Sequence, residues 1–339
     1  MATPEQELLR QGLQALAPQL HAMGGTIEAL QRLSGGASQE TWSFDLRLGD
    51  GRTLPLILRR APAGSAARAA GNASLDVQAR LQSVAAAAGV PVPAVVCVLQ
   101  PEHGAGEGFI MQRIDGETLG RRIVGEARLA DARERLAWQC GQALARIHRI
   151  AADGLPPLRR APPAVELAHY EAQYRSHGLS KPVFELAMQW LRAHAPADTP
   201  RLSLVHGDFR NGNLVVGEDG LRAVLDWELA HLGDPMEDLG WLCVNSWRFG
   251  RHELPVGGFG TREQLVAGYA EAGGQVDAAR VHYWEVLGTL KWGVICQSMA
   301  QSFFSGAERN VERAAIGRRA SEAEIDLLAL LAPRTRKAA

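Results

Sequence analysis

Residues 202–238 read LSLVHGDFRNGNLVVGEDGLRAVLDWELAHLGDPMED, and polar residues recur in this stretch at spacings that chemistry can use. These residues are His206, Asp208, Asn213 and Asp226. An apolar run ending at Val205 leads into His206-Gly207-Asp208, where Gly207 relaxes the backbone. We therefore expect a loop after a short buried strand, with the Asp208 carboxylate pointing into a cleft.

Two apolar runs follow Asn213, and together they predict a β-hairpin. Residues 217–220, Gly-Glu-Asp-Gly, form its four-residue loop. This loop pairs Asn213 with Val224, so Asp226 lies two residues beyond the partner of Asn213 and shares its face of the hairpin. Diagonal neighbours of this kind lie roughly 7–8 Å apart. An amide oxygen and a carboxylate at that distance can hold one Mg²⁺ between them.

This set of side chains matches the needs of phosphoryl transfer. The reaction needs a carboxylate that accepts the proton of an acceptor hydroxyl, here Asp208, and oxygen ligands for Mg²⁺, here Asn213 and Asp226. The spacing H-x-D-x-x-x-x-N followed by Asp is also the protein-kinase pattern. Isolated Asp residues are usually turn or cap residues, but chance produces this constellation only on the order of once in a thousand chains of this length.

The stretch resembles the aminoglycoside phosphotransferase and choline kinase-like family, whose signature is H-G-D-x-x-x-x-N followed by D-x-[DE]. Residues 233–241 are similar to the branch related to the phosphotransferase domain fused to some acyl-CoA dehydrogenases. The resemblance implies an α+β, two-lobed protein-kinase-like fold that binds ATP and Mg²⁺ in its cleft. A small antiparallel β-rich lobe, residues 1–114, would bind the nucleotide, and a larger α-rich lobe, residues 115–339, would carry catalysis and the acceptor.

Further site residues follow from the resemblance. Asp238 would brace the catalytic loop from behind, with plain stabilisation of the helix dipole as the alternative, and His206 would support the loop. Gly35, Gly36 and Ser38 lie in a turn between predicted strands whose backbone N–H groups can approach phosphates. A plain hairpin turn is the alternative, because G-x-G-x-x-G is absent. The adenine would meet the backbone of a hinge formed by Gln112, Arg113 and Ile114.

The phosphate-binding lysine of the family is missing from the third predicted strand. The first lysine of the chain is Lys181, and Arg59 occupies the lysine position. Arginine can grip phosphate bidentately, although a strand-end arginine in solvent is the alternative. The acid that would partner this group falls on Gln78, with Asp76 the nearest carboxylate. This departure puts in doubt the ion pair that the family forms between the strand lysine and an acid on the next helix.

A helix start is predicted at residues 234–237, Asp-Pro-Met-Glu, which read as an N-cap, a first-position proline and a capping-box acid. A helix from this point would carry the chain roughly 20 Å to Arg248 and Arg251. With Trp241 and Trp247 between, these arginines suggest a rim for an anionic acceptor. The alternatives are solvated arginines and ordinary core tryptophans.

The composition excludes several classes of protein. The chain has 339 residues, 46% hydrophobic and 22% charged, with a formal net charge of −1. These values describe an ordinary soluble protein with two lobes and favour neither nucleic acid nor a membrane as partner. Four cysteines without a C-x-x-C pair indicate neither a zinc site nor a disulfide framework. We expect a cytoplasmic monomer or homodimer without a signal peptide or a spanning helix.

The function predicted from the sequence is ATP-dependent phosphorylation of a hydroxyl group on a small molecule. One alternative is a catalytically impaired nucleotide-binding regulator, motivated by Arg59 and Gln78. Phosphorylation of proteins is disfavoured because no Ala-Pro-Glu segment follows Asp226. The sequence leaves open whether the donor is ATP or GTP. The acceptor also stays open among aminoglycosides, amino alcohols, sugars and hydroxyacyl-CoA thioesters.

Overall fold

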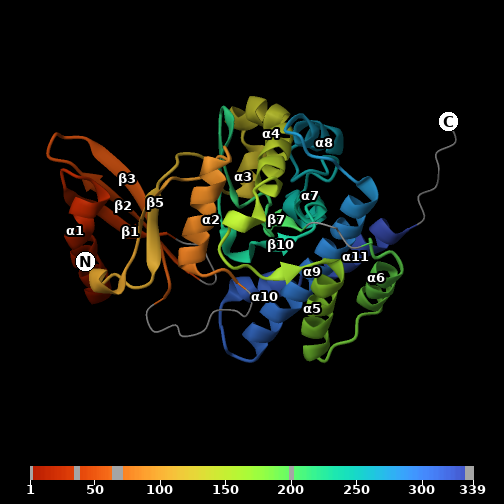
Figure 1. Cartoon of the computed structure of the whole chain (residues 1–339). Coiled ribbons are helices and arrows are strands. Elements are labelled where there is room, and N and C mark those ends of the chain that lie inside the picture. The colour runs from red at the N-terminus through yellow and green to blue at the C-terminus, as the bar shows by residue number, and fades with distance from the viewer. Residues whose placement is uncertain (1–2, 34–38, 63–71, 198–201, 333–339) are drawn as a thin grey trace.

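The computed structural model describes residues 3–33, 39–62, 72–197 and 202–332. Figure 1 shows a β-sheet with helix α1 at one end of the molecule, a helical region at the other end, and helix α2 between them. This arrangement, a small antiparallel β-rich part and a larger α-rich part, confirms the α+β fold class predicted from the sequence.

Within the described residues, five strands form the N-terminal sheet in the order β1-β2-β3-β5-β4, with antiparallel neighbours throughout. Their bounds are β1 Thr26–Arg32, β2 Glu40–Arg47, β3 Thr53–Arg60, β4 Val95–Val98 and β5 Gly108–Gln112. Alternate side chains of a strand point to opposite faces, so Leu56 and Leu58 join the core under α1 (Pro4–Leu20), while Ile57 joins the core under α2 (Leu75–Ala87). The two helices thus cover opposite faces of the sheet.

The predicted hairpin consists of β8 (Leu214–Gly217) and β9 (Gly220–Val224). The predicted pairing of Asn213 with Val224 is wrong by one residue, because Leu214 occupies that place. The register shifts between Val215 and Val216, and such a bulge fits an extra residue into one strand. The backbone carbonyl of Asn213 instead accepts from the N–H of Leu225, at 2.9 Å.

A second small sheet sets the position of the loop before the hairpin. Strand β7 (Ser203–Val205) pairs antiparallel with β10 (His231–Gly233), and β10 pairs parallel with β6 (Arg160–Ala161). The chain therefore enters the loop that carries Asp208 from β7 and returns beside it in β10. This return brings the start of the following helix directly behind the loop.

The helical region packs around the long helix α9, Ala278–Phe304. The other α-helices of this region, within the described residues, are α3 Gly120–Gly125, α4 Ala130–His148, α5 Pro163–Ser176, α6 Pro182–Ala193, α7 Met236–Leu242, α8 Arg262–Glu271, α10 Val311–Gly317 and α11 Ala320–Leu331. Residues of α4, α7, α8 and α9 share one apolar core. Strands β8 and β9 contribute Leu214, Val216 and Val224 to the same core, which anchors the hairpin.

Helix α7 differs from its prediction at both ends. It ends at Leu242 and a short 3₁₀ turn follows at Asn245–Trp247, so no long helix runs to the predicted arginines. Asp234 accepts from the N–H of Met236 at 3.1 Å, as a residue before a helix start does. Glu237 accepts from Nε2 of His231 at 3.0 Å instead of completing a capping box.

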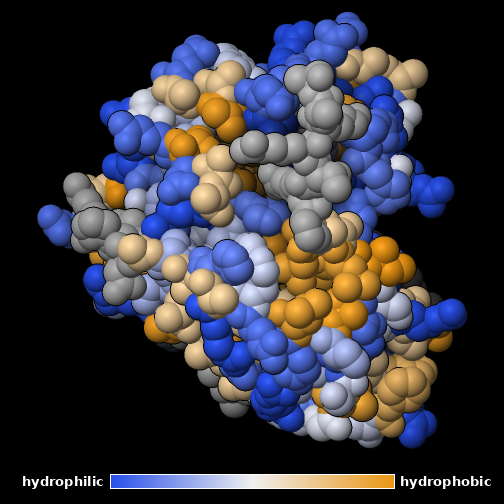
Figure 2. Space-filling model, turned by 90° about the vertical axis from the view of Figure 1, so that its right-hand side faces the viewer, coloured by the Kyte–Doolittle hydropathy of each residue, from blue (hydrophilic) through white to orange (hydrophobic). Residues whose placement is uncertain are grey.

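Some apolar surface stays outside the core. Figure 2 shows a face on which hydrophobic residues gather in a patch among hydrophilic ones. Large exposed apolar side chains of the C-terminal helices and their connections, within the described residues, are Phe304, Val311, Ile325 and Leu328. None of the helices in the described part of the chain has both the length and the apolarity needed to cross a membrane. All four cysteines are free.

The contact between α7 and α9 gives a prediction about stability. A Cβ atom on Gly240 would lie 2.7 Å from the backbone nitrogen of Glu285, so Gly240→Ala must push the two helices apart. We expect the free energy of unfolding, measured by urea denaturation, to fall by about 1–3 kcal/mol. Gly125→Ala is the control, because nothing lies within 4 Å of its Cβ position. Equal stability of both variants would contradict this close packing.

Candidate active site

Asp208 lies in the loop after β7, and both of its carboxylate oxygens are hydrogen-bonded. Oδ2 accepts from Nδ2 of Asn213 at 2.6 Å. Oδ1 accepts from Nε1 of Trp241 at 2.9 Å and from Nε of Arg210 at 3.0 Å. The side chain of Asp208 is 14% exposed, so the carboxylate is held in one orientation and still reaches solvent.

Asp238, in the first turn of α7, is completely buried behind this loop. Its carboxylate accepts from the backbone N–H of His206 at 2.8 Å and of Gly207 at 2.9 Å. Nε2 of His148 lies 3.0 Å from the same carboxylate. Burial acts to raise the pKa of Asp238, but these partners, His148 foremost, outweigh it and hold the pKa below its usual value. A charged carboxylate therefore fixes the backbone just before Asp208.

Gly207 is required at this point by its conformation. Its φ of +78° lies in the left-handed region, which favours glycine. A Cβ atom there would also come within 2.5 Å of the Leu229 carbonyl oxygen. The glycine of the motif thus lets the loop pass close beneath the chain that leads into β10.

His206 connects the loop to the hairpin. Burial lowers the pKa of His206, so the ring is neutral at neutral pH. Its Nδ1 accepts from the backbone N–H of Asp208 at 3.2 Å, which places the proton on Nε2. Nε2 then donates to the carbonyl of Leu225 at 3.1 Å, directly before Asp226.

Asp226 follows β9 with a left-handed backbone, φ 68° and ψ 72°, which is uncommon for a residue other than glycine. This conformation turns its carboxylate toward the N-terminal sheet, where Nη2 of Arg59 donates to Oδ1 at 2.8 Å. Burial acts to raise the pKa of Asp226, but the Arg59 guanidinium outweighs it and holds the pKa below its usual value. One ion pair thus links β3 to the catalytic hairpin.

Gln78 takes no part in an ion pair with Arg59. It is buried on α2, and its Nε2 donates to the carbonyl of Ala73 at 2.8 Å. Asp76 is exposed on the same helix. In place of an acid on the helix, Asp226 supplies the carboxylate partner of Arg59.

Arg59 retains unused hydrogen-bonding capacity. Its Nε is buried without a hydrogen-bond partner in the part of the chain that the structure describes. A buried polar group of this kind is costly unless a partner arrives. The guanidinium therefore fits the binding of an anion such as a nucleotide phosphate.

Two of the three backbone N–H groups of the predicted hinge are already hydrogen-bonded to neighbouring backbone carbonyls. The N–H of Gln112 donates to the carbonyl of Ala94 at 2.9 Å, and the N–H of Arg113 donates to that of Pro55 at 3.0 Å. Within the described ranges, no backbone carbonyl accepts from the N–H of Ile114. The predicted phosphate-loop residues lie outside the described residues; they are Gly35, Gly36 and Ser38.

Asn213 and Asp226 form the predicted metal-binding set. Nδ2 of Asn213 donates to both the backbone carbonyl and the carboxylate of Asp208, which turns its amide oxygen away from that carboxylate. Among the described residues, no group of three or more His, Cys, Asp and Glu side chains is arranged to hold a metal. Mg²⁺ typically takes one or two protein carboxylates together with substrate phosphates. The oxygen donors at this position fit that mode of binding.

The two arginines of the predicted rim are both paired with carboxylates of this protein. Arg248 is largely buried, and its Nη2 lies 3.3 Å from a carboxylate oxygen of Glu285. Nε of Arg251 lies 2.6 Å from Glu253. Because the chain kinks after α7, both guanidinium groups meet carboxylates of this protein.

Two contacts near Asp208 were missed by the sequence analysis. Arg210 lies at a variable position of the motif, and its guanidinium lies 4.6 Å from the ring centroid of Trp247. Lys291 lies far away in the sequence on α9, yet its Nζ donates to the carbonyl of Gly207 at 3.1 Å. No spacing rule signals either residue, since the contacts arise only when α7 and α9 pack behind the loop.

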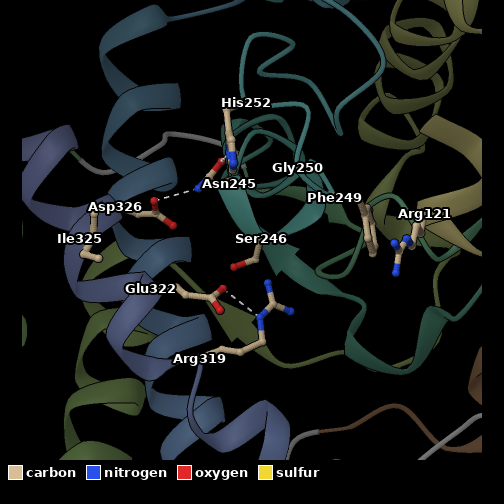
Figure 3. A pocket seen from close by; sticks show the side chains of 10 residues that line it. All are labelled: Arg121, Asn245, Ser246, Phe249, Gly250, His252, Arg319, Glu322, Ile325 and Asp326. Atoms are coloured by element: carbon tan, nitrogen blue, oxygen red, sulfur yellow. Dashed lines mark hydrogen bonds and ion pairs between the residues drawn. The ribbon is translucent and has the colours of Figure 1, made fainter. Parts of the chain in front are cut away.

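A cavity of about 640 Å³ is lined in part by Asn245 and Ser246, the two residues before Trp247. Figure 3 shows Arg121 and Phe249 on one side and Arg319, Glu322, Ile325 and Asp326 on the other. Asn245 donates to Asp326 at 2.9 Å, and Arg319 pairs with Glu322 at the same distance. The lining therefore offers charges of both signs together with apolar surface.

Solved structures with a similar fold include phosphotransferases. A Ralstonia eutropha protein solved as a candidate aminoglycoside phosphotransferase has a TM-score of 0.74 and 20% identity, with 94% of this chain and 97% of that chain covered. A thermostable mutant of the aminoglycoside phosphotransferase APH(4)-Ia, in a ternary complex with ADP and hygromycin B, has a TM-score of 0.58 and 19% identity, with 90% of this chain and 94% of that chain covered.

Curated relatives are longer proteins. The chain is 31% identical to mouse (Mus musculus) acyl-CoA dehydrogenase family member 10 over 65% of its length, and 30% identical to the probable acyl-CoA dehydrogenase IBR3 of Arabidopsis thaliana over 62%. It spans only 20% and 27% of the lengths of these two relatives. The model of the phosphotransferase enzyme family matches residues 29–275, most of the chain. The chain therefore belongs to the phosphotransferase enzyme family.

Proposed function

We propose that the protein transfers the terminal phosphoryl group of ATP to a hydroxyl group of a small molecule. The observation that carries this proposal is the Asp208 carboxylate, which is held at both oxygens beside Asn213 and still reaches solvent. The family membership and the ADP-bound structural relative support it. In this proposal, residues 1–114 bind the nucleotide and residues 115–339 bind the acceptor.

Asp208 acts as the base that orients the acceptor hydroxyl. Phosphoryl transfer depends on positioning and electrostatics more than on covalent chemistry. A carboxylate with fixed oxygens keeps one lone pair aimed at the hydroxyl and takes its proton as the new phosphate ester forms. Asp238, Lys291 and His206 hold the backbone from residue 206 to residue 208, which carries this carboxylate.

Arg59 and Asp226 bind the phosphate end of the nucleotide. Asp226, with the amide oxygen of Asn213, holds Mg²⁺, which neutralises charge on the phosphates. Arg59 donates to phosphate oxygens through its guanidinium, including the Nε that no described residue uses. Arg59 finds a carboxylate partner in Asp226, so the absence of an acid at Gln78 does not leave the arginine unpaired.

The cavity in Figure 3 is the proposed site of the acceptor. Its lining has positive and negative side chains, hydrogen-bond donors and acceptors, and apolar contacts from Phe249 and Ile325. Such a lining suits a polar molecule that carries several hydroxyl or amide groups. No excess of one charge selects a polycation or a polyanion. The acceptor is therefore best found by experiment across chemical classes.

An ATP-consumption screen with Mg²⁺ tests the function. It would compare aminoglycosides, amino alcohols, sugars and hydroxyacyl-CoA thioesters, with mass spectrometry of the products. The expected result is a mass increase of one phosphate on a hydroxyl-bearing acceptor. Nucleotide binding without product in any class would contradict the proposal and favour the regulator. Repeating the screen with GTP in place of ATP would show which nucleotide is the phosphoryl donor.

Replacing the proposed base should separate chemistry from binding. Asp208→Asn keeps the size of the side chain and its place beside Asn213 but cannot accept the acceptor proton. We expect kcat to fall by about 10²–10⁴-fold, while the Kd for ATP, measured by calorimetry, changes little. A variant that retains most of the parent turnover would exclude Asp208 as the base.

Replacing the proposed metal ligand should change how Mg²⁺ affects ATP binding. Asp226→Ala removes the charged ligand, so the gain in ATP affinity on adding Mg²⁺ should shrink by about tenfold or more. Calorimetry with and without Mg²⁺ measures this gain. Asp219→Ala is the matched control, because Asp219 lies exposed at the turn of the same hairpin. The assignment fails if both variants respond to Mg²⁺ as the parent does.

A further inference from the structure

Trp241 and Lys291 form a buried assembly behind the catalytic carboxylate. We propose that Trp241 is a positioning residue for Asp208, and that the ammonium group of Lys291 holds the Trp241 ring in the orientation that this task needs. The inference rests on the proposed function, because Asp208 must be the base for its position to matter. It adds two residues that the sequence motif does not contain.

The contact of Trp241 with Asp208 differs from those of its neighbours. Trp241 is 3% exposed on α7, and its Nε1 donates to Oδ1 of Asp208 at 2.9 Å. Trp247 and Trp292 pack in the same aromatic cluster. The ring centroids of Trp241 and Trp247 lie 5.1 Å apart, and those of Trp247 and Trp292 lie 4.8 Å apart. In both, Nε1 is buried without a partner among the described residues. The cluster thus tolerates unpaired indole groups, whereas Trp241 directs its N–H at the carboxylate.

Lys291 supplies a buried positive charge over the face of the Trp241 ring. It is 4% exposed, and its Nζ lies 4.4 Å from the Trp241 ring centroid. The same Nζ donates to the carbonyl of Gly207 at 3.1 Å. Burying an ammonium group is costly unless it is paired, and a desolvated cation attracts the face of an indole ring. Lys291 therefore fixes both the ring and the peptide before Asp208.

The surroundings keep Lys291 charged. Burial acts to lower the pKa of Lys291, but Tyr170, Glu237 and Glu166 outweigh it and raise the pKa above its ordinary value. The ring of Tyr170 lies on another side of the ammonium group, with 5.6 Å between Nζ and its centroid. An ammonium group enclosed in this way has no alternative position in solvent, so its contacts with Gly207 and Trp241 are permanent.

The consequence for catalysis is geometric. Oδ1 of Asp208 is held by Trp241 and Arg210, and Oδ2 is held by Asn213. Arg210 is about a quarter exposed, so its side chain can leave when a substrate enters, whereas Trp241 is buried and stays. Trp241 is therefore the permanent donor that sets the rotation of the carboxylate toward the acceptor hydroxyl.

Trp241→Phe tests the inference, because it keeps a ring over Lys291 and removes only the indole N–H and part of the volume. We expect kcat to fall by about tenfold, with the KM for ATP within about twofold of the parent. Trp292→Phe is the matched control, since it removes a similar volume from the same cluster and an N–H with no described partner. The control should keep the kcat of the parent. Equal kcat in all three proteins contradicts the inference.

Lys291→Met then tests the role of the ammonium group, since methionine keeps the apolar stem. If Lys291 acts through Trp241, the double variant with Trp241→Phe should lose no more kcat than the worse single variant. Effects that multiply would show that Lys291 acts without Trp241 and would refute that part of the inference. Thermal unfolding of each variant separates loss of fold from loss of rate.

The indole ¹⁵N–¹H signals give a readout that does not depend on turnover. The signal of Trp241, assigned by its loss in Trp241→Phe, should move in both Asp208→Asn and Lys291→Met, while that of Trp292 stays in place in Asp208→Asn. An unmoved Trp241 signal contradicts the contact. Absence of phosphoryl transfer in the parent would refute the proposed function and this inference together. If the parent transfers phosphate and Trp241→Phe has the same kcat, this inference alone is refuted.

Discussion

The buried carboxylate of Asp238 is the interaction on which the arrangement of the site depends. It accepts from the two peptide N–H groups that precede Asp208 and lies within hydrogen-bond distance of His148. Removing a hydrogen-bond partner of a buried carboxylate is strongly destabilising, because part of the buried charge is then left unsatisfied. His148 and Asp238 belong to helices α4 and α7, so the packing of these two helices also stabilises the loop that carries Asp208. The site keeps its geometry as long as this core stays packed.

Much of this fold could be predicted, since the hydrophobic pattern of the strands and helices is local. The motif also placed Asp208 and Asn213 in one loop, where they are in contact. The one-residue shift in the hairpin could not be predicted, because a bulge is set by how both strands pack into the core. The end of α7 was missed for a similar reason: the following turn buries Trp247 and most of the Arg248 side chain, a tertiary effect that overrides helical periodicity.

The residues around Asp208 show where sequence spacing stops being informative. His148 is buried, and its partner Asp238 is ninety residues away in the sequence. Lys291 and Trp241 meet only through the packing of α9 on α7. The substitution at the lysine position of β3 is easier to rationalise with the structure. The longer, forked side chain of Arg59 reaches Asp226 directly, so a second acid on α2 is not needed for pairing.

The ion pair between Arg59 and Asp226 has a further consequence, because each side chain is a competitor for the ligand of the other. The carboxylate occupies the guanidinium that would hold phosphate, and the guanidinium occupies the carboxylate that would hold a cation. Since both groups belong to one chain, each faces the other at a high effective concentration. In the proposed function, an incoming nucleotide and its cation would displace this internal partner together, and the pair would re-form as they leave. Such a site would discriminate against a nucleotide without its cation, and against a cation without its nucleotide.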